Sequence, residues 1–152
     1  MRHIILAMAV FIAVLLAAAA EVCPDPAAPC AGFRDHDLSF KRESTGVARA
    51  EERSAAFFAV ILASAAPCAI DEKSRLQAQS RFPGRKVFSA RFECDGDVEN
   101  NVSYTNVDGK RAVLAVYAGA TRDEAQKVLA EARANGYQGA NVRRMQVVFV
   151  HP

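Results

Sequence analysis

The pattern of apolar and polar positions is clearest in the last third of the chain, where it predicts a strand, a helix and a second strand. Residues 112–117 are bulky and apolar, as in a buried strand. Thr121 and Glu124 then have the spacing of a capping box, which starts a helix. Gly136 ends that helix without a Cβ penalty, and residues 141–150 form the next strand, with an apolar end. The predicted buried face of the helix consists of Ala125, Val128, Leu129 and Ala132.

A second, weaker copy of this pattern precedes it. Residues 57–63 are continuously apolar and short, which is typical of a central strand. A helix is predicted over residues 70–81, with Pro67 in its first turn. Residues 86–93 alternate apolar and polar side chains, which indicates a half-buried strand, and residues 95–106 are polar and rich in turn formers.

The order β, α, β, β, α, β predicts an α+β fold, namely a ferredoxin-like or RNP-like four-stranded antiparallel sheet with both helices on one face. Three of the strands are apolar on both faces, whereas two helices cover only one face. The other face is therefore either an exposed apolar platform for a ligand or partner, or a surface covered by residues 21–55. Both interpretations stay open at this point.

The N-terminus has the charge order of a signal peptide. Met1-Arg2-His3 precedes residues 4–20, which contain no charge and no proline, and Glu21 follows a run of three alanines. We expect cleavage before Glu21 and a periplasmic or secreted protein with no stable membrane anchor. The alternative is an uncleaved anchor, but a helix over residues 4–20 would barely cross a hydrocarbon layer of ~30 Å at ~1.5 Å per residue.

These features divide the chain into a signal peptide (residues 1–20), a polar linker that contains cysteines (residues 21–55) and one domain (residues 56–152). Within the linker, residues 48–56 are compatible with a short helix but offer it little apolar surface.

The formal net charge of +2 and the lack of a basic stripe argue against a nucleic-acid partner. Arg143-Arg144, the tight basic pair in the last strand, is interpreted as a solvated strand edge.

Four cysteines in an exported chain predict disulfides rather than a metal site, and no CxxC or zinc-type spacing is present. Three pairings are possible. The predicted topology favours Cys68 with Cys94, because both follow strands that end at the same sheet edge, and it leaves Cys23 with Cys30. The strands lie about two spacings of ~4.8 Å apart, so flanking turns must bring Cys68 and Cys94 within the ~7 Å that a bridge requires. His36 and His151 are expected to be surface histidines.

Several short motifs resemble those of a known family. The end of a strand and the start of the capped helix have the sequence Val-Tyr-Ala-Gly-Ala-Thr-Arg-Asp-Glu-Ala at residues 116–125. The segment that leads into the last strand has the sequence Gly-Tyr-Gln-Gly-Ala at residues 136–140. Residues 60–64 and 82–84 resemble its first half. On these motifs, residues 57–150 are similar to a SPOR domain, the sporulation-related repeat of bacterial envelope proteins. Two positions depart from the family pattern, because Tyr117-Ala-Gly stands where Gly-Pro-Phe is usual and Ile61 stands where glutamine is frequent.

The resemblance implies that the chain binds peptidoglycan glycan strands stripped of stem peptides, through the open sheet face and without catalysis or a cofactor. Tyr117 would stack on a sugar ring, while Ser64 and Arg91 would exchange hydrogen bonds with it. Each has a plainer alternative, since Tyr117 suits strand-end packing, Ser64 suits a turn and Arg91 suits a surface pair with Glu93.

No hydrolase or metalloprotease motif is present, which argues against an enzyme. The alternative function is a protein-interaction or inhibitor-like module of the same shape, which would use the open face or a sheet edge against another envelope protein. A glycan binder should present a groove that mixes aromatic and polar side chains. A protein binder should present a flatter apolar patch with a charged rim.

Overall fold

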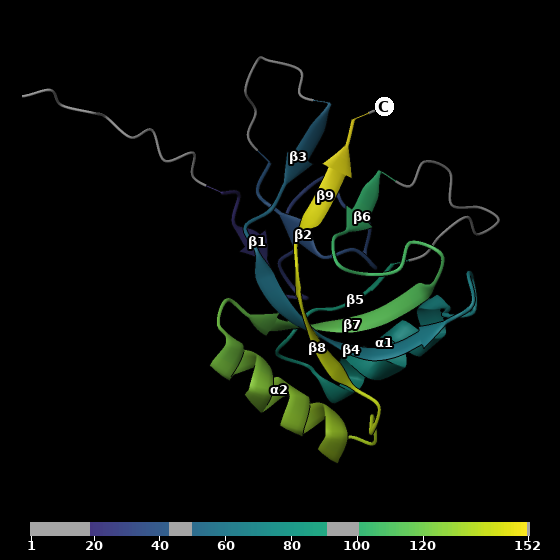
Figure 1. Cartoon of the computed structure of the whole chain (residues 1–152). Helices are drawn as coiled ribbons and strands as arrows, with labels where there is room; N and C mark the ends of the chain where they lie inside the picture. The colour runs from purple at the N-terminus through teal and green to yellow at the C-terminus, as the bar shows by residue number, and fades with distance from the viewer. Residues whose placement is uncertain (1–18, 43–49, 91–100, 152) are drawn as a thin grey trace, which may run out of the picture.

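The computed structural model describes residues 19–42, 50–90 and 101–151 (Figure 1). In these ranges the chain forms two helices and nine strands, and the strands pair into three sheets. Every pair of strands is antiparallel. The chain is therefore an α+β protein with antiparallel sheets, as predicted, although three sheets are present where the sequence predicted one.

The largest sheet has the strand order β5-β7-β4-β8, and both helices pack on the same face of it (Figure 1). A buried cluster that includes Val60, Val116 and Val128 fills the space between this face and the helices. We call the opposite face the outer face. The bounds are β4 Phe57–Ala65, α1 Glu72–Arg81, β5 Val87–Ala90, β7 Ala112–Gly119, α2 Arg122–Ala134 and β8 Asn141–Met145.

Helix α2 begins and ends as the sequence predicts. Thr121 Oγ1 accepts a hydrogen bond from Glu124 N, and Glu124 Oε2 accepts one from Thr121 N at 2.9 Å, which completes the capping box. Gly119 makes this possible, because a Cβ on its backbone would lie 2.6 Å from Glu124 Oε2. Gly136 follows the helix at φ +92°, and all four predicted core positions are buried.

Helix α1 begins later than predicted. Its N-cap is Asp71, whose carboxylate accepts a hydrogen bond from Ser74 N at 2.8 Å, so Pro67 lies outside the first turn. The buried residues of α1 are Arg75 and Ala78.

The predicted last strand divides at Gln146 into two strands that belong to different sheets. β8 pairs with β4, whereas β9 (Val147–Val150) pairs with β3 (Glu51–Arg53) and β6 (Val102–Tyr104). Gln146 is fixed between them, because its N–H donates to Thr105 Oγ1 at 2.8 Å and its side chain donates to Ser54 O at 3.0 Å. The sequence of residues 48–56 is compatible with a short helix, but in their described part residues 51–53 form strand β3, which pairs with β9.

Residues 20–42, which we call the cover segment, pack on the outer face. Of the two interpretations that the sequence left open for this face, the described part of the chain thus agrees with coverage by the N-terminal segment. It contains the two-stranded sheet of β1 (Val22–Cys23) and β2 (Ser39–Phe40). Leu38 and Phe40 are completely buried in a second core, together with Phe57 and Phe88 of the large sheet. Because these few buried apolar side chains stand in a stretch with many polar residues, they form no recognisable sequence pattern.

The cover segment also closes the β5 edge of the large sheet. Lys86 N donates to Pro24 O at 3.0 Å, and Ser89 N donates to His36 O at 2.9 Å. β5 is consequently buried on both sides, which corrects the half-buried strand that its alternating pattern predicted. His36 is only 8% exposed and is not a surface histidine. His151 lies at the rim, where its Nε2 is 2.6 Å from Glu52 Oε1.

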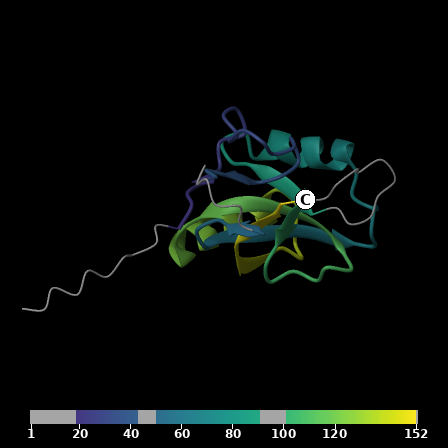
Figure 2. The same ribbon diagram turned by 90° about the horizontal axis from the view of Figure 1, so that it is seen from above.

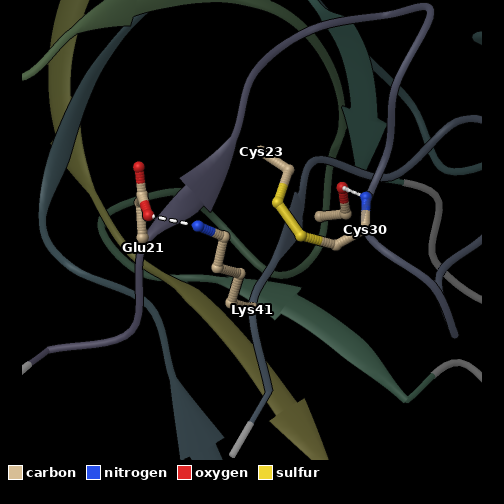
Figure 3. The surroundings of a disulfide bond; sticks show 5 residues. Glu21, Cys23, Cys30 and Lys41 are labelled. Carbon is tan, nitrogen blue, oxygen red and sulfur yellow. Dashed lines mark hydrogen bonds and ion pairs between the residues drawn. A yellow bond between two sulfur atoms is a disulfide. The ribbon is translucent and has the colours of Figure 1, made fainter.

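A disulfide between Cys23 and Cys30 holds the cover segment, as predicted (Figure 3). Cys30 N donates to Ser39 Oγ at 2.9 Å, and Lys41 Nζ lies 2.6 Å from Glu21 Oε2. Cys68 is also disulfide-bonded, while its predicted partner Cys94 lies outside the described residues. Disulfides are typical of an oxidising compartment.

We predict that Phe40→Ala lowers the free energy of unfolding by about 3–5 kcal/mol, because it leaves a cavity beneath the cover segment. Leu76→Ala is the control, since Leu76 is 53% exposed, and should change it by less than about 0.5 kcal/mol. Urea unfolding of the oxidised proteins measures both. Equal effects of the two substitutions would contradict the buried position of Phe40.

Tyr104 anchors the cover segment through a buried hydrogen bond, because its hydroxyl oxygen accepts from Leu38 N at 2.9 Å. We predict that Tyr104→Phe costs about 1–3 kcal/mol, since it leaves the Leu38 N–H without an acceptor. Burial raises the pKa of Tyr104 well above its usual value of 10.0. The unfolded phenol therefore loses its proton first, and the free energy of unfolding falls as the pH rises above about 10.

The pH dependence can be measured by urea unfolding between pH 8 and pH 11 for the wild type and Tyr104→Phe. The variant should lose less stability over this range, because the titrating group is gone. Tyr137→Phe, on the helix-covered side, serves as the control and should keep the wild-type decline. A decline of the same steepness in Tyr104→Phe would show that other groups cause it.

Candidate functional site

The cover segment and the β3-β9-β6 sheet leave one end of the outer face open as a groove. This groove has a volume of about 450 Å³. Ile61 of β4 and Val113 of β7 form its apolar floor, and both are more than nine-tenths buried. We call it the Ser64 groove, and its polar lining consists of Ser64, Asn106, Asp108, Arg111, Asn141 and Arg143.

Strand register brings these residues together from distant parts of the chain. Ser64 lies opposite Val113 in the β4–β7 pair, and Asn141 lies opposite Ile61 in the β4–β8 pair. Arg143 is two positions farther along β8 and so projects to the same face as Asn141. The loop before β7 supplies Arg111.

The polar groups of the groove are held by one another. Arg111 donates from Nε to Ser64 Oγ at 2.8 Å and from a terminal nitrogen to Ser64 O at 3.1 Å. Arg143 Nε donates to Asn141 Oδ1 at 3.1 Å, and Asn106 Nδ2 donates to Arg144 O at 3.2 Å. A guanidinium carries five N–H groups, so these bonds orient Arg111 and Arg143 and leave further donors for a ligand.

The charge of the groove is positive, because two guanidinium groups face a single carboxylate, that of Asp108. Guanidinium groups bind carboxylates with paired, charge-assisted hydrogen bonds, and the amides of Asn106 and Asn141 suit hydroxyl groups. Across the described ranges, no group of three or more His, Cys, Asp or Glu residues could hold a metal ion. The arrangement is suited to binding a polar, anionic ligand over an apolar floor.

The structure separates the residues that were predicted to bind glycan. Ser64 lines the groove, but Tyr117 lies four residues beyond Val113 on β7, about 13 Å away at ~3.3 Å per residue. The Tyr117 ring packs against Phe57 with 5.7 Å between centroids, and burial raises the pKa of its hydroxyl. Arg91 lies outside the described residues.

Sequence reasoning missed Arg111 and assigned Arg143 only to a solvated edge. Arg143 is exposed on the edge strand β8, as expected, yet it also lines the groove. Both residues become candidates only once the register of β8 against β4 and the path of the loop before β7 are known. The Asp108-Gly109 turn was a usable signal, since the residues that follow such a turn lie at a sheet end.

The chain matches no known protein family, no curated protein and no solved structure in the comparisons. Among the described residues, no helix is long and apolar enough to cross a membrane.

We predict that Tyr117→Ala lowers the free energy of unfolding by about 1–3 kcal/mol, because the half-buried ring packs on Phe57. Ser64→Ala should change it by less than about 0.5 kcal/mol, since Ser64 is exposed at the groove. Urea unfolding measures both. A larger loss for Ser64→Ala than for Tyr117→Ala would contradict the separate structural and groove positions of these residues.

Proposed function

We propose that this chain is an exported, non-catalytic protein of the cell envelope that binds peptidoglycan glycan strands in the Ser64 groove. The observation that carries the proposal is the pair of guanidinium groups, Arg111 and Arg143, beside an apolar floor and two amide side chains. Sugar rings have apolar faces and hydroxyl edges, which suit such a floor and such amides.

The positive charge of the groove favours one chemical form of the glycan, the strand without stem peptides. Each muramic acid residue carries a lactyl carboxyl group, which is tied up as an amide while a stem peptide is attached. Removal of the peptide leaves a carboxylate, and the strand becomes an anionic polymer with its charges at regular intervals. The two arginines that line the groove would favour this stripped form over the intact one.

The proposed membership of the SPOR-like class is supported by the βαββαβ order and by the sheet order β5-β7-β4-β8 with two helices on one face, which suit a ferredoxin-like or RNP-like arrangement. Such domains would use the open sheet face. Here the cover segment occupies much of that face, so the groove is the part of it that a strand would reach. Export is supported by the apolar N-terminal sequence and by the disulfide.

The alternative, a protein-interaction module, is favoured by one specific observation. β8 lies at the edge of the large sheet, and its residues are mostly exposed. Such an edge can accept an additional strand from a partner, although Arg143 and Arg144 are charges of the kind that discourage this pairing. None of the described residues that line the groove is aromatic, so the apolar floor lies where a glycan binder was expected to present an aromatic ring.

The experiment is co-sedimentation of the purified, oxidised protein with peptidoglycan sacculi, with and without prior amidase treatment. We predict enrichment on the treated sacculi. The double variant Arg111→Ala/Arg143→Ala should lower the affinity at least about tenfold, because charge-assisted hydrogen bonds contribute about 1.5–3 kcal/mol each.

Arg122→Ala is the matched control, since Arg122 is an exposed arginine on α2, on the helix-covered side. It should bind like the wild type. Absence of binding to both kinds of sacculi would reject the glycan function and favour the edge-strand alternative. Equal losses in the groove variant and the control would show that charge alone, and not the groove, drives binding.

A further inference from the structure

A second cavity lies between the cover segment and helix α1, apart from the Ser64 groove. Figure 2 shows the cover segment beside α1. The cavity has a volume of about 290 Å³, and Pro26, Pro29 and Asp35 of the cover segment line it on one side. Arg75, Leu76 and Gln79 of α1 also line it, as does Lys86, which directly precedes β5. We call it the Lys86 cavity.

Two of its polar side chains are committed to the fold. Arg75 is paired with Glu72 through its Nε at 2.8 Å, and it donates to Val87 O at 3.2 Å. Gln79 donates to the carbonyl oxygens of Phe82 and Arg85 and accepts from Val87 N at 2.9 Å. These groups shape the cavity but have their partners already.

Lys86 differs from both. It is only 4% exposed, and its ammonium donates to Asp35 O at 2.6 Å. An ammonium has three donors, and this carbonyl is its acceptor among the residues that the structure describes. No carboxylate in the described ranges lies within ion-pair distance of Lys86 Nζ. Burial, and then the positive charge of Arg75, lower the pKa of Lys86, while Asp35, Asp37 and Glu72 oppose that shift. A buried ammonium that lacks a carboxylate partner is stabilised when an anion binds to it.

The other wall of the cavity is apolar. Leu76 is 53% exposed, which is unusual for a large apolar side chain of this protein, and it stands with the rings of Pro26 and Pro29 at the cavity. An aliphatic group between them would be removed from water. The Asp35 carboxylate at the same cavity disfavours ligands with more than one negative charge.

We propose that the Lys86 cavity binds a small organic monocarboxylate, with its carboxylate on the Lys86 ammonium and a short aliphatic body against Leu76, Pro26 and Pro29. The proposal does not depend on glycan binding, because the cavity shares no residue with the Ser64 groove.

The test is a titration of the full, oxidised protein with 3-methylbutanoate, followed by the shifts of backbone amide signals in NMR spectra. Its neutral isostere, 3-methylbutanamide, is titrated in parallel. We expect the carboxylate to bind at least about tenfold more tightly than the amide and to shift signals of α1 and the cover segment.

Two variants test the two halves of the site. Lys86→Met removes the cation and should abolish the preference for the carboxylate. Leu76→Glu replaces an exposed apolar wall by a negative charge without touching the core, so it should abolish binding in a folded protein. Lys110→Met, at an exposed lysine before β7, is the control and should bind like the wild type. Equal affinity for acid and amide, or unchanged binding by Leu76→Glu, would overturn the proposal.

Discussion

The structure depends on the burial of one apolar surface, the outer face of the β5-β7-β4-β8 sheet. Two helices fill only the other face, so a sheet that is apolar on both sides needs a second layer. The cover segment and β9 supply it, and Phe40 and Phe149 pack there over Phe57 and Phe88. The part of the face that this layer leaves uncovered is the Ser64 groove. The location of the candidate site is therefore a consequence of how far the cover extends.

The division of the last strand at Gln146 connects the two layers. β8 belongs to the large sheet and β9 to the smaller one, while Gln146 bonds to Thr105 and Ser54 at the crossing point. One continuous stretch of chain thus fixes the groove wall at Arg143 and the second core at Phe149. A backbone shift at Gln146 would therefore displace both the groove wall and the second core.

Local signals predicted the elements that are decided locally. The α2 helix follows from its capping box, its 3.6-residue period and Gly136, and β4 and β7 follow from continuous apolar runs. The cover over the outer face could be predicted only as one of two open interpretations, because two buried apolar side chains, Leu38 and Phe40, in a polar stretch carry no periodicity. The break at Gln146 was equally hidden, since its cause is hydrogen bonding to residues more than 40 positions away in the chain.

The candidate site was predictable only in part, for the same reason. Ser64 was found because it ends a strand whose identity was clear. Arg111 and Arg143 come together only through the register of β8 on β4, which no local pattern encodes. Tyr117 has an aromatic ring of the kind that stacks on sugars, but this ring packs against Phe57 instead.

The hydrogen bond between Leu38 and Tyr104 joins residues 66 positions apart, and that between Ser54 and Val147 spans 93. A ribosome makes a chain from its N-terminus, so the cover exists long before the surface that it covers. Until β6 and β9 follow, the second core around Leu38 and Phe40 lacks the side chains that these two strands contribute. The order of synthesis therefore exposes Leu38 and Phe40 until the late strands β6 and β9 are made, and contacts of such long range favour slow folding and a need for chaperone protection in the interval.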